Sequence, residues 1–87
     1  MNVDIVRDKF LERQKITLVI SKNHEIDESK VIELMQETLK ICFHSSIRFD
    51  MYQTDQEYIM MLESKNTELI TVIWMLQKDF PNTCFNY

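Results

Sequence analysis

The feature that most constrains this chain of 87 residues is that it contains no glycine. Glycine adopts positive φ without steric cost and lets the backbone approach a ligand closely. Phosphate-binding loops, dinucleotide-binding fingerprints and nucleophile elbows all require it, so the sequence excludes these motifs. Turns must be built from Asn, Asp and Ser, whose short side chains bond to the neighbouring backbone. Function is therefore to be sought in binding surfaces more than in cofactor chemistry.

The size and composition of the chain fit one small globular unit. Hydrophobic residues make up 45% of the chain and charged residues 28%, which predicts a single α+β domain over residues 1–87. No apolar run approaches the ~20 residues that a bilayer span needs. The first residues include Asp4 and Arg7 and lack the apolar stretch of a signal peptide. We therefore expect a cytoplasmic protein without membrane contact.

Apolar residues near the start of the chain recur with a helical period. Val3, Val6 and Phe10 stand at positions i, i+3 and i+7, which predicts an amphipathic helix over residues 2–13. Further along, β-branched and alternating runs predict strands, and two amphipathic stretches predict helices. The predicted order is strand 16–21, helix 28–43, strand 47–52, strand 58–62, helix 69–80 and a short strand 83–87.

The predicted order after the N-terminal helix is βαββαβ, which is the ferredoxin-like arrangement. In that topology the first and third strands are central and the second lies at an edge. The runs 16–21 and 58–62 are apolar on both faces, whereas the run 47–52 alternates. We therefore expect an N-terminal helix followed by a ferredoxin-like two-layer sandwich. An all-α bundle is the alternative, because Met and Leu in the run 58–62 are good helix formers.

Charge is distributed unevenly along the chain, whose formal net charge is −4. Residues 1–22 carry an excess of basic side chains, whereas residues 23–87 carry eleven acids and five bases. Nucleic acid is not expected as a partner, because phosphate contacts need a basic face. The expected partner is another protein with a basic surface, because opposite charges steer such an encounter.

Two stretches hold the residue types of catalytic or metal sites, but neither predicts one. His24 and the carboxylates within residues 25–28 include metal-ligand types, yet acids are expected at a helix start. Cys42, His44 and Ser45 place a thiol beside a base, without an orienting acid or an oxyanion donor. Cys42 is interpreted as a small buried hydrophobe. We therefore expect no catalytic residue, no metal, no cofactor and no enzymatic activity.

Six residues are the candidates for partner binding: Asp50, Tyr52, Asp55, Glu57, Ile70 and Trp74. The three carboxylates would form an acidic rim on the predicted hairpin, and Tyr and Trp are enriched among residues that dominate binding energy. Trp74 lies outside the apolar stripe of its helix. Either the N-terminal helix covers it or a partner does.

The favoured function is a small acidic inhibitor of the immunity or antitoxin type. It would bind and neutralise a basic, nuclease-like toxin or a defence protein, and a phage anti-defence protein is one alternative. A self-associating structural or regulatory module is another, and its homodimer would pair through the strand 47–52 or through Ile70 and Trp74. No motif in the chain matches a family that we can name.

Overall fold

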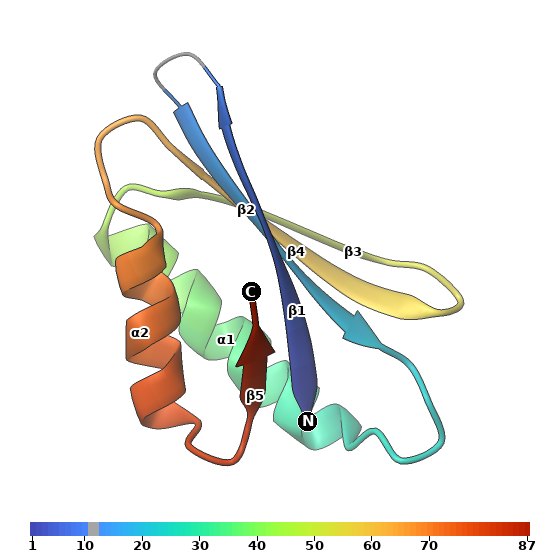
Figure 1. Ribbon diagram of the computed structural model, residues 1–87. Helices are drawn as coiled ribbons and strands as arrows, with labels where there is room; N and C mark the ends of the chain where they lie inside the picture. Colours follow the sequence, from blue (N-terminus) through green and yellow to red (C-terminus); the bar gives the residue numbers. More distant parts are fainter. Residues whose placement is uncertain (11–12) are drawn as a thin grey trace.

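The computed structural model describes residues 1–10 and 13–87. It is an α+β structure with a five-stranded mixed sheet and two helices (Figure 1). The all-α alternative is therefore wrong. In chain order the elements are β1 (Asn2–Phe10), β2 (Arg13–Ser21), α1 (Glu28–His44), β3 (Arg48–Gln53), β4 (Glu57–Ser64), α2 (Ile70–Asp79) and β5 (Cys84–Asn86).

The N-terminal helix was predicted wrongly, because residues 2–10 form strand β1. Val3 and Ile5 are buried with 0% and 7% of their surface exposed, whereas Val6 is 50% exposed. Val3 and Val6 therefore lie on opposite faces of the sheet, as residues three apart in a strand must. The spacing of Val3 and Val6 fits a helix, but the spacing of Val3 and Ile5 fits a strand, and the helix prediction did not take Ile5 into account. The side chain of Phe10 lies outside the part of the chain that the structure describes.

The strand order is β3-β4-β2-β1-β5, which is not the predicted ferredoxin-like order. In a ferredoxin-like sheet the strand after the second helix would lie beside the strand before the first, so β5 would pair with β2. Here β1 lies between them, antiparallel to β2 and parallel to β5. The expectation that residues 16–21 and 58–62 form interior strands is confirmed, and so is the edge position of residues 47–52.

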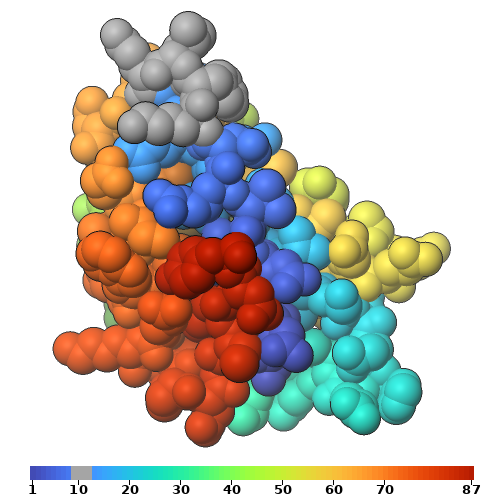
Figure 2. Space-filling view, in the orientation of Figure 1, coloured from blue at the N-terminus to red at the C-terminus, as the bar shows by residue number. Residues whose placement is uncertain are grey.

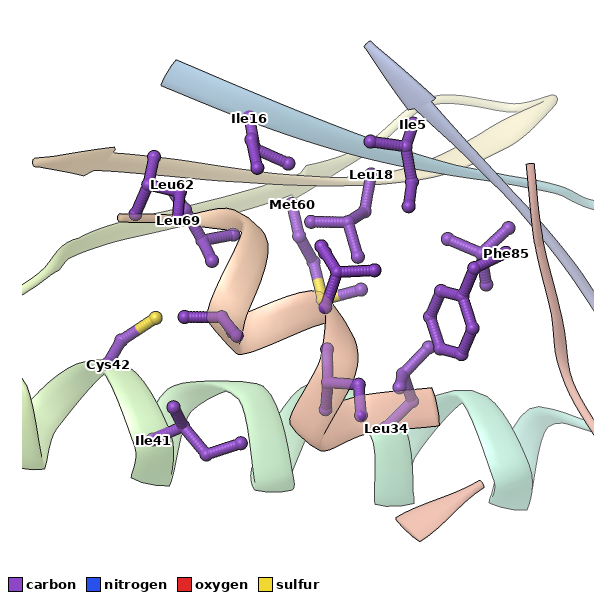
Figure 3. Close-up of a cluster of buried hydrophobic side chains, with 14 of the residues drawn as sticks. Ile5, Ile16, Leu18, Leu34, Ile41, Cys42, Met60, Leu62, Leu69 and Phe85 are labelled. Atoms are coloured by element: carbon purple, nitrogen blue, oxygen red, sulfur yellow. The ribbon is translucent and has the colours of Figure 1, made fainter. Parts of the chain in front are cut away.

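Both helices cover the same face of the sheet (Figure 1). The core lies between these two layers, where the inward residues of the strands meet α1 and α2 (Figure 3). Leu18 and Met60, which are cross-strand partners on β2 and β4, are fully buried at its centre. Leu34 from α1 and Ile73 from α2 are also fully buried. The core is therefore built from the apolar stripes of the two helices and from every second residue of the strands.

Helix α1 is capped at both ends, by a side chain at its start and by backbone N–H groups at its end. The Asp27 carboxylate, at the helix N-cap position, accepts a hydrogen bond of 3.0 Å from the Ser29 N–H. At the other end Ser46 adopts a positive φ of 55°. The next N–H, of Ile47, returns to the Cys42 carbonyl at 2.9 Å. Ser46 thus occupies the left-handed position that glycine usually fills after a helix.

The end of the chain returns to its beginning. Helix α2 ends at Asp79, just before Pro81, and the chain then enters β5 beside β1. Figure 2 shows β5 lying on the molecular surface against the first strand. Within residues 1–10 and 13–87, no helix combines the length and apolar character needed to cross a membrane.

Candidate functional site

The candidate site is the face of the sheet that is turned away from the helices, here called the open face. Strand side chains alternate between the two faces, so the residues next to the buried ones point outward. The register of the sheet then places these outward residues in cross-strand rows. No other described element covers this face (Figure 1). It is therefore the largest regular surface that the fold leaves available.

Apolar side chains occupy the middle of the open face. One row runs across three adjacent strands through Tyr52, Ile59 and Val19. In the next row, Thr17 of β2 lies between Met61 of β4 and Val6 of β1. Tyr52 and Val6 are about half exposed, and the others are half-buried by their neighbours. A solvated strand face normally carries polar residues, so this apolar centre is a departure from the usual alternation.

Carboxylates surround the apolar centre. Eight charged residues lie in or at the ends of the outward rows, five acids and three bases: Asp4, Asp8, Asp50, Glu57, Glu63, Arg13, Lys15 and Arg48. Arg48 pairs with Asp50 at 3.3 Å, and Arg13 pairs with Glu63 at 3.0 Å. Because acids outnumber bases, the rim is negative overall and would attract a positively charged surface.

The β3–β4 hairpin holds further acidic groups at one end of the open face. Without glycine, its loop is closed by the Thr54 hydroxyl, which accepts from the Glu57 N–H at 3.0 Å. The Lys22 ammonium donates to the Gln53 side chain and to the Thr54 carbonyl, both at 2.7 Å. It also lies 4.6 Å from the centre of the Tyr58 ring, which is a cation–π contact. These contacts fix the loop that carries Asp55.

Tyr58 lies on the helix side of β4, where it links the sheet to α1. Its hydroxyl donates a long hydrogen bond of 3.5 Å to the Glu28 carboxylate. The pKa of Tyr58 is raised, first because its hydroxyl is partly desolvated and then because of the negative charge of Glu28. Tyr58 therefore remains a neutral donor in the neutral pH range.

The structure divides the predicted partner-binding residues between two sides of the molecule. Asp50, Tyr52 and Glu57 lie on the open face, and Asp55 lies in the adjoining hairpin loop. Ile70 and Trp74 belong to α2, in the layer on the other side of the sheet. The six residues therefore do not form one surface.

Trp74 is 58% exposed, and no N-terminal helix covers it, because residues 2–10 are strand β1. Ile70 is half-buried against the core. Met75, beside Trp74, is also exposed. These α2 residues form a separate apolar surface, which is not part of the open face.

The sequence-based prediction missed half of the open face. It places Asp4, Val6 and Asp8 on a helix, and it assigns Val19, Ile59 and Met61 to strands that are apolar on both faces without naming them as binding residues. The available signal was the alternation of Asp4, Val6 and Asp8 around Ile5, which has a period of two. With β1 assigned as a strand, its outward residues would have joined those of β3 and β4.

Neither protein-family models nor curated proteins nor solved structures gave a match to this chain. The role of this chain must therefore be inferred from the chemistry of its surface.

Cys42 and Asp27, which belong to the two stretches with catalytic or metal-ligand residue types, have structural roles. Cys42 is fully buried, and burial raises the pKa of its thiol to about 11, so the thiol stays protonated and poorly nucleophilic. This confirms its interpretation as a small core residue. The Asp27 carboxylate is occupied in capping α1. Among the described residues, no group of three or more His, Cys, Asp or Glu side chains is arranged to hold a metal ion.

Proposed function

We propose that this chain is a binding protein that recognises a basic surface of another protein through its open face and inhibits that protein by occupying it. This is the immunity or antitoxin type of action. The observation that carries the proposal is the arrangement of the open face, an apolar centre within an acidic rim. The described part of the chain offers a surface for binding, and its His, Cys, Asp and Glu side chains form no group of three or more that could hold a metal ion.

The composition of the open face supports a role in protein recognition. Interfaces typically have an apolar, desolvated centre and a polar rim, with aromatic residues enriched among the strongest contributors. Tyr52 can serve as such an aromatic contact, because it is half exposed and lies in the apolar row with Ile59 and Val19. A partner that covers this row would remove these side chains from water.

The charges support a basic partner. The formal net charge is −4, and the rim of the open face has more acids than bases. A negative rim accelerates association with a positive surface and disfavours nucleic acid, whose phosphates are negative. The basic active site of a nuclease toxin is a surface of this kind. Occupying such a site would block its substrate without any reaction by the inhibitor.

The test is co-purification from the native host with three tagged proteins, each at low and high salt. Asp55→Lys with Glu57→Lys reverses two charges at the open face. Glu33→Lys with Glu37→Lys reverses two charges on α1, in the other layer, and is the matched control. We expect the unmodified protein and the control to retain one stoichiometric basic protein at low salt. The open-face variant should lose it.

The captured protein must then be assayed for activity with and without the purified chain. Tyr52→Ala tests the apolar centre separately from the charge, and we expect it to weaken binding at least tenfold. Capture that is equal for the open-face variant and the control would refute the open face as the site. Capture without any loss of the partner's activity would refute inhibition.

A further inference from the structure

Strand β3 is a free edge of the sheet and lacks the proline, lysine or bulge that commonly protects such an edge; its two charged side chains, Arg48 and Asp50, pair with each other at 3.3 Å. Edge strands are commonly blunted by proline, lysine or a bulge. Residues 48–53 contain neither proline nor lysine, and their register against β4 runs without interruption. At the opposite side, β5 is only three residues long. The edge at β3 is therefore the longer regular template for another strand.

The hydrogen-bond pattern identifies which backbone groups β3 offers at this edge. The Thr54 N–H bonds to the Glu57 carbonyl at 2.9 Å, which fixes the alternation along the hairpin. Residues 48, 50 and 52 therefore bond to β4, and the backbone groups of Phe49, Met51 and Gln53 point away from it. The three outward residues are symmetric about Met51.

Helix α1 carries an exposed apolar stripe in the layer below this edge. The α1 stripe consists of Ile32, Leu39 and Phe43, which are 48%, 52% and 80% exposed. At about 100° per residue, the three side chains lie within a narrow arc of the helix surface. Met35 extends the stripe toward the core, where it is half-buried. The stripe adds a second apolar surface to a helix whose inner face is already buried.

The α1 stripe and the free edge lie on the same flank of the molecule. Helix α1 contacts β3, whereas α2 contacts β5, so α1 is the helix on the β3 side. Glu33 and Glu37 of α1 border a hollow together with Asp79, the last residue of α2, and Phe80, which follows it. The stripe is on the other side of α1, turned away from α2. One flank, here called the β3 flank, therefore leaves both the sheet layer and the helix layer unpartnered.

From these observations we infer that the β3 flank is the docking surface for a second copy of this chain. The two β3 strands pair antiparallel and join the two sheets, and the two α1 stripes pack against each other beneath them. A single extended peptide would satisfy the strand edge but would leave the α1 stripe in water. A second copy presents a strand edge above an apolar helix and so completes both layers at once.

The free backbone groups select one register. A two-fold axis at Met51 pairs Met51 with its copy and Phe49 with Gln53 of the second chain, so every outward backbone group finds a partner. An axis at Phe49 would need the Ile47 N–H, which is already bonded to Cys42. An axis at Asp50 would set two carboxylates directly opposite each other, which is destabilising. The proposed dimer is therefore centred on Met51.

The first test is the mass of the pure protein in solution, measured by sedimentation equilibrium up to millimolar concentration. We expect twice the 10.6 kDa of the single chain. Ile32→Glu with Leu39→Glu should restore the mass of one chain. Trp74→Glu with Met75→Glu is the matched control, because these side chains are exposed to a similar extent on α2, and it should remain a dimer.

The second test addresses the strand edge. Met51→Pro removes the outward N–H at the axis without removing a hydrogen bond to β4, so we expect a folded single chain by circular dichroism. In a Cys84→Ser background, Met51→Cys should form an intermolecular disulfide under mild oxidation, because residues opposite each other lie about 5.5 Å apart. Gln53→Cys should not, because its copy is four residues away along the pair.

Three results would overturn the inference. They are a single-chain mass at every concentration, a dimer that survives the Ile32/Leu39 variant, and a dimer that only the Trp74/Met75 variant dissociates. The proposed inhibition is tested separately, by capture through the open face, so either proposal can fail without the other.

Discussion

The most informative perturbation of the fold is one substitution made at two positions of β1. Val3→Ala and Val6→Ala remove the same atoms from residues three apart. Val3 is fully buried and pairs with Phe85 of β5, whereas Val6 is half exposed on the open face. A helix over these residues would place both valines on one buried face. The strand predicts that only Val3 matters for stability.

The expected magnitudes follow from burial. Truncating Val3 removes two methyl groups worth about 0.8 kcal/mol each and leaves a cavity, so the loss is about 2–3 kcal/mol. Truncating the half-exposed Val6 leaves no cavity, and the loss is below about 1 kcal/mol. A domain of this size has a total free energy of unfolding of roughly 4–13 kcal/mol. The first change is therefore a large fraction of the whole and the second is not.

Urea unfolding followed by far-UV circular dichroism measures both variants against the unmodified chain. The midpoint should fall clearly for Val3→Ala and only slightly for Val6→Ala, with unchanged slopes in denaturant. Equal losses in the two variants would refute the alternating burial of β1. They would restore the helical assignment and remove Val6 from the open face.

Three further predictions concern two groups, the Cys42 thiol and the Asp27 carboxylate. In the native protein a thiol reagent should label Cys84 and not Cys42, which is buried and protonated, and labelling of both before unfolding would contradict the core position of Cys42. In the folded protein the pKa of the Cys42 thiol is raised from 9.0 to about 11. The stability that the buried neutral thiol contributes is therefore present below pH 9 and falls as the pH rises from 9 to about 11. The free energy of unfolding of Cys42→Ala should lack the part of the alkaline decrease that comes from this thiol. Asp27→Ala should lower the free energy of unfolding by about 1 kcal/mol through loss of the helix cap. An unchanged urea midpoint would show that the Asp27 hydrogen bond contributes nothing.

The elements after residue 15 could be predicted from the sequence because each is defined by its own local pattern. Helix α1 has a cap at Asp27 and a clear stripe, and the observed helix differs from the prediction by one residue at its end. The run 58–62 shows the limit of such patterns, since Met and Leu favour helices and yet form the interior strand β4. There the neighbouring strands decided the structure, not the intrinsic preference.

The N-terminal segment and the strand order could not be predicted in the same way. Val3 and Val6 satisfy a helical spacing, and the alternation that indicates a strand is short, because Val6 directly follows Ile5 and interrupts the apolar-polar pattern. The place of β1 between β2 and β5 depends on pairing between residues more than eighty positions apart. Such pairing leaves no local signal. The same error hid Asp4 and Val6 from the candidate site, because a face made of four strands is visible only once all four are assigned.

The two proposed surfaces meet on β3, and this has a consequence for binding. Asp50 and Tyr52 point to the open face, while the edge of the same strand would pair with its copy. In a dimer centred on Met51, Asp50 of each chain lies opposite Tyr52 of the other, and the two open faces become one continuous surface. The acidic rims of both chains would then act on a partner together. A dimeric chain should therefore bind a basic protein more tightly than the Met51→Pro single chain, although that substitution leaves every open-face side chain in place.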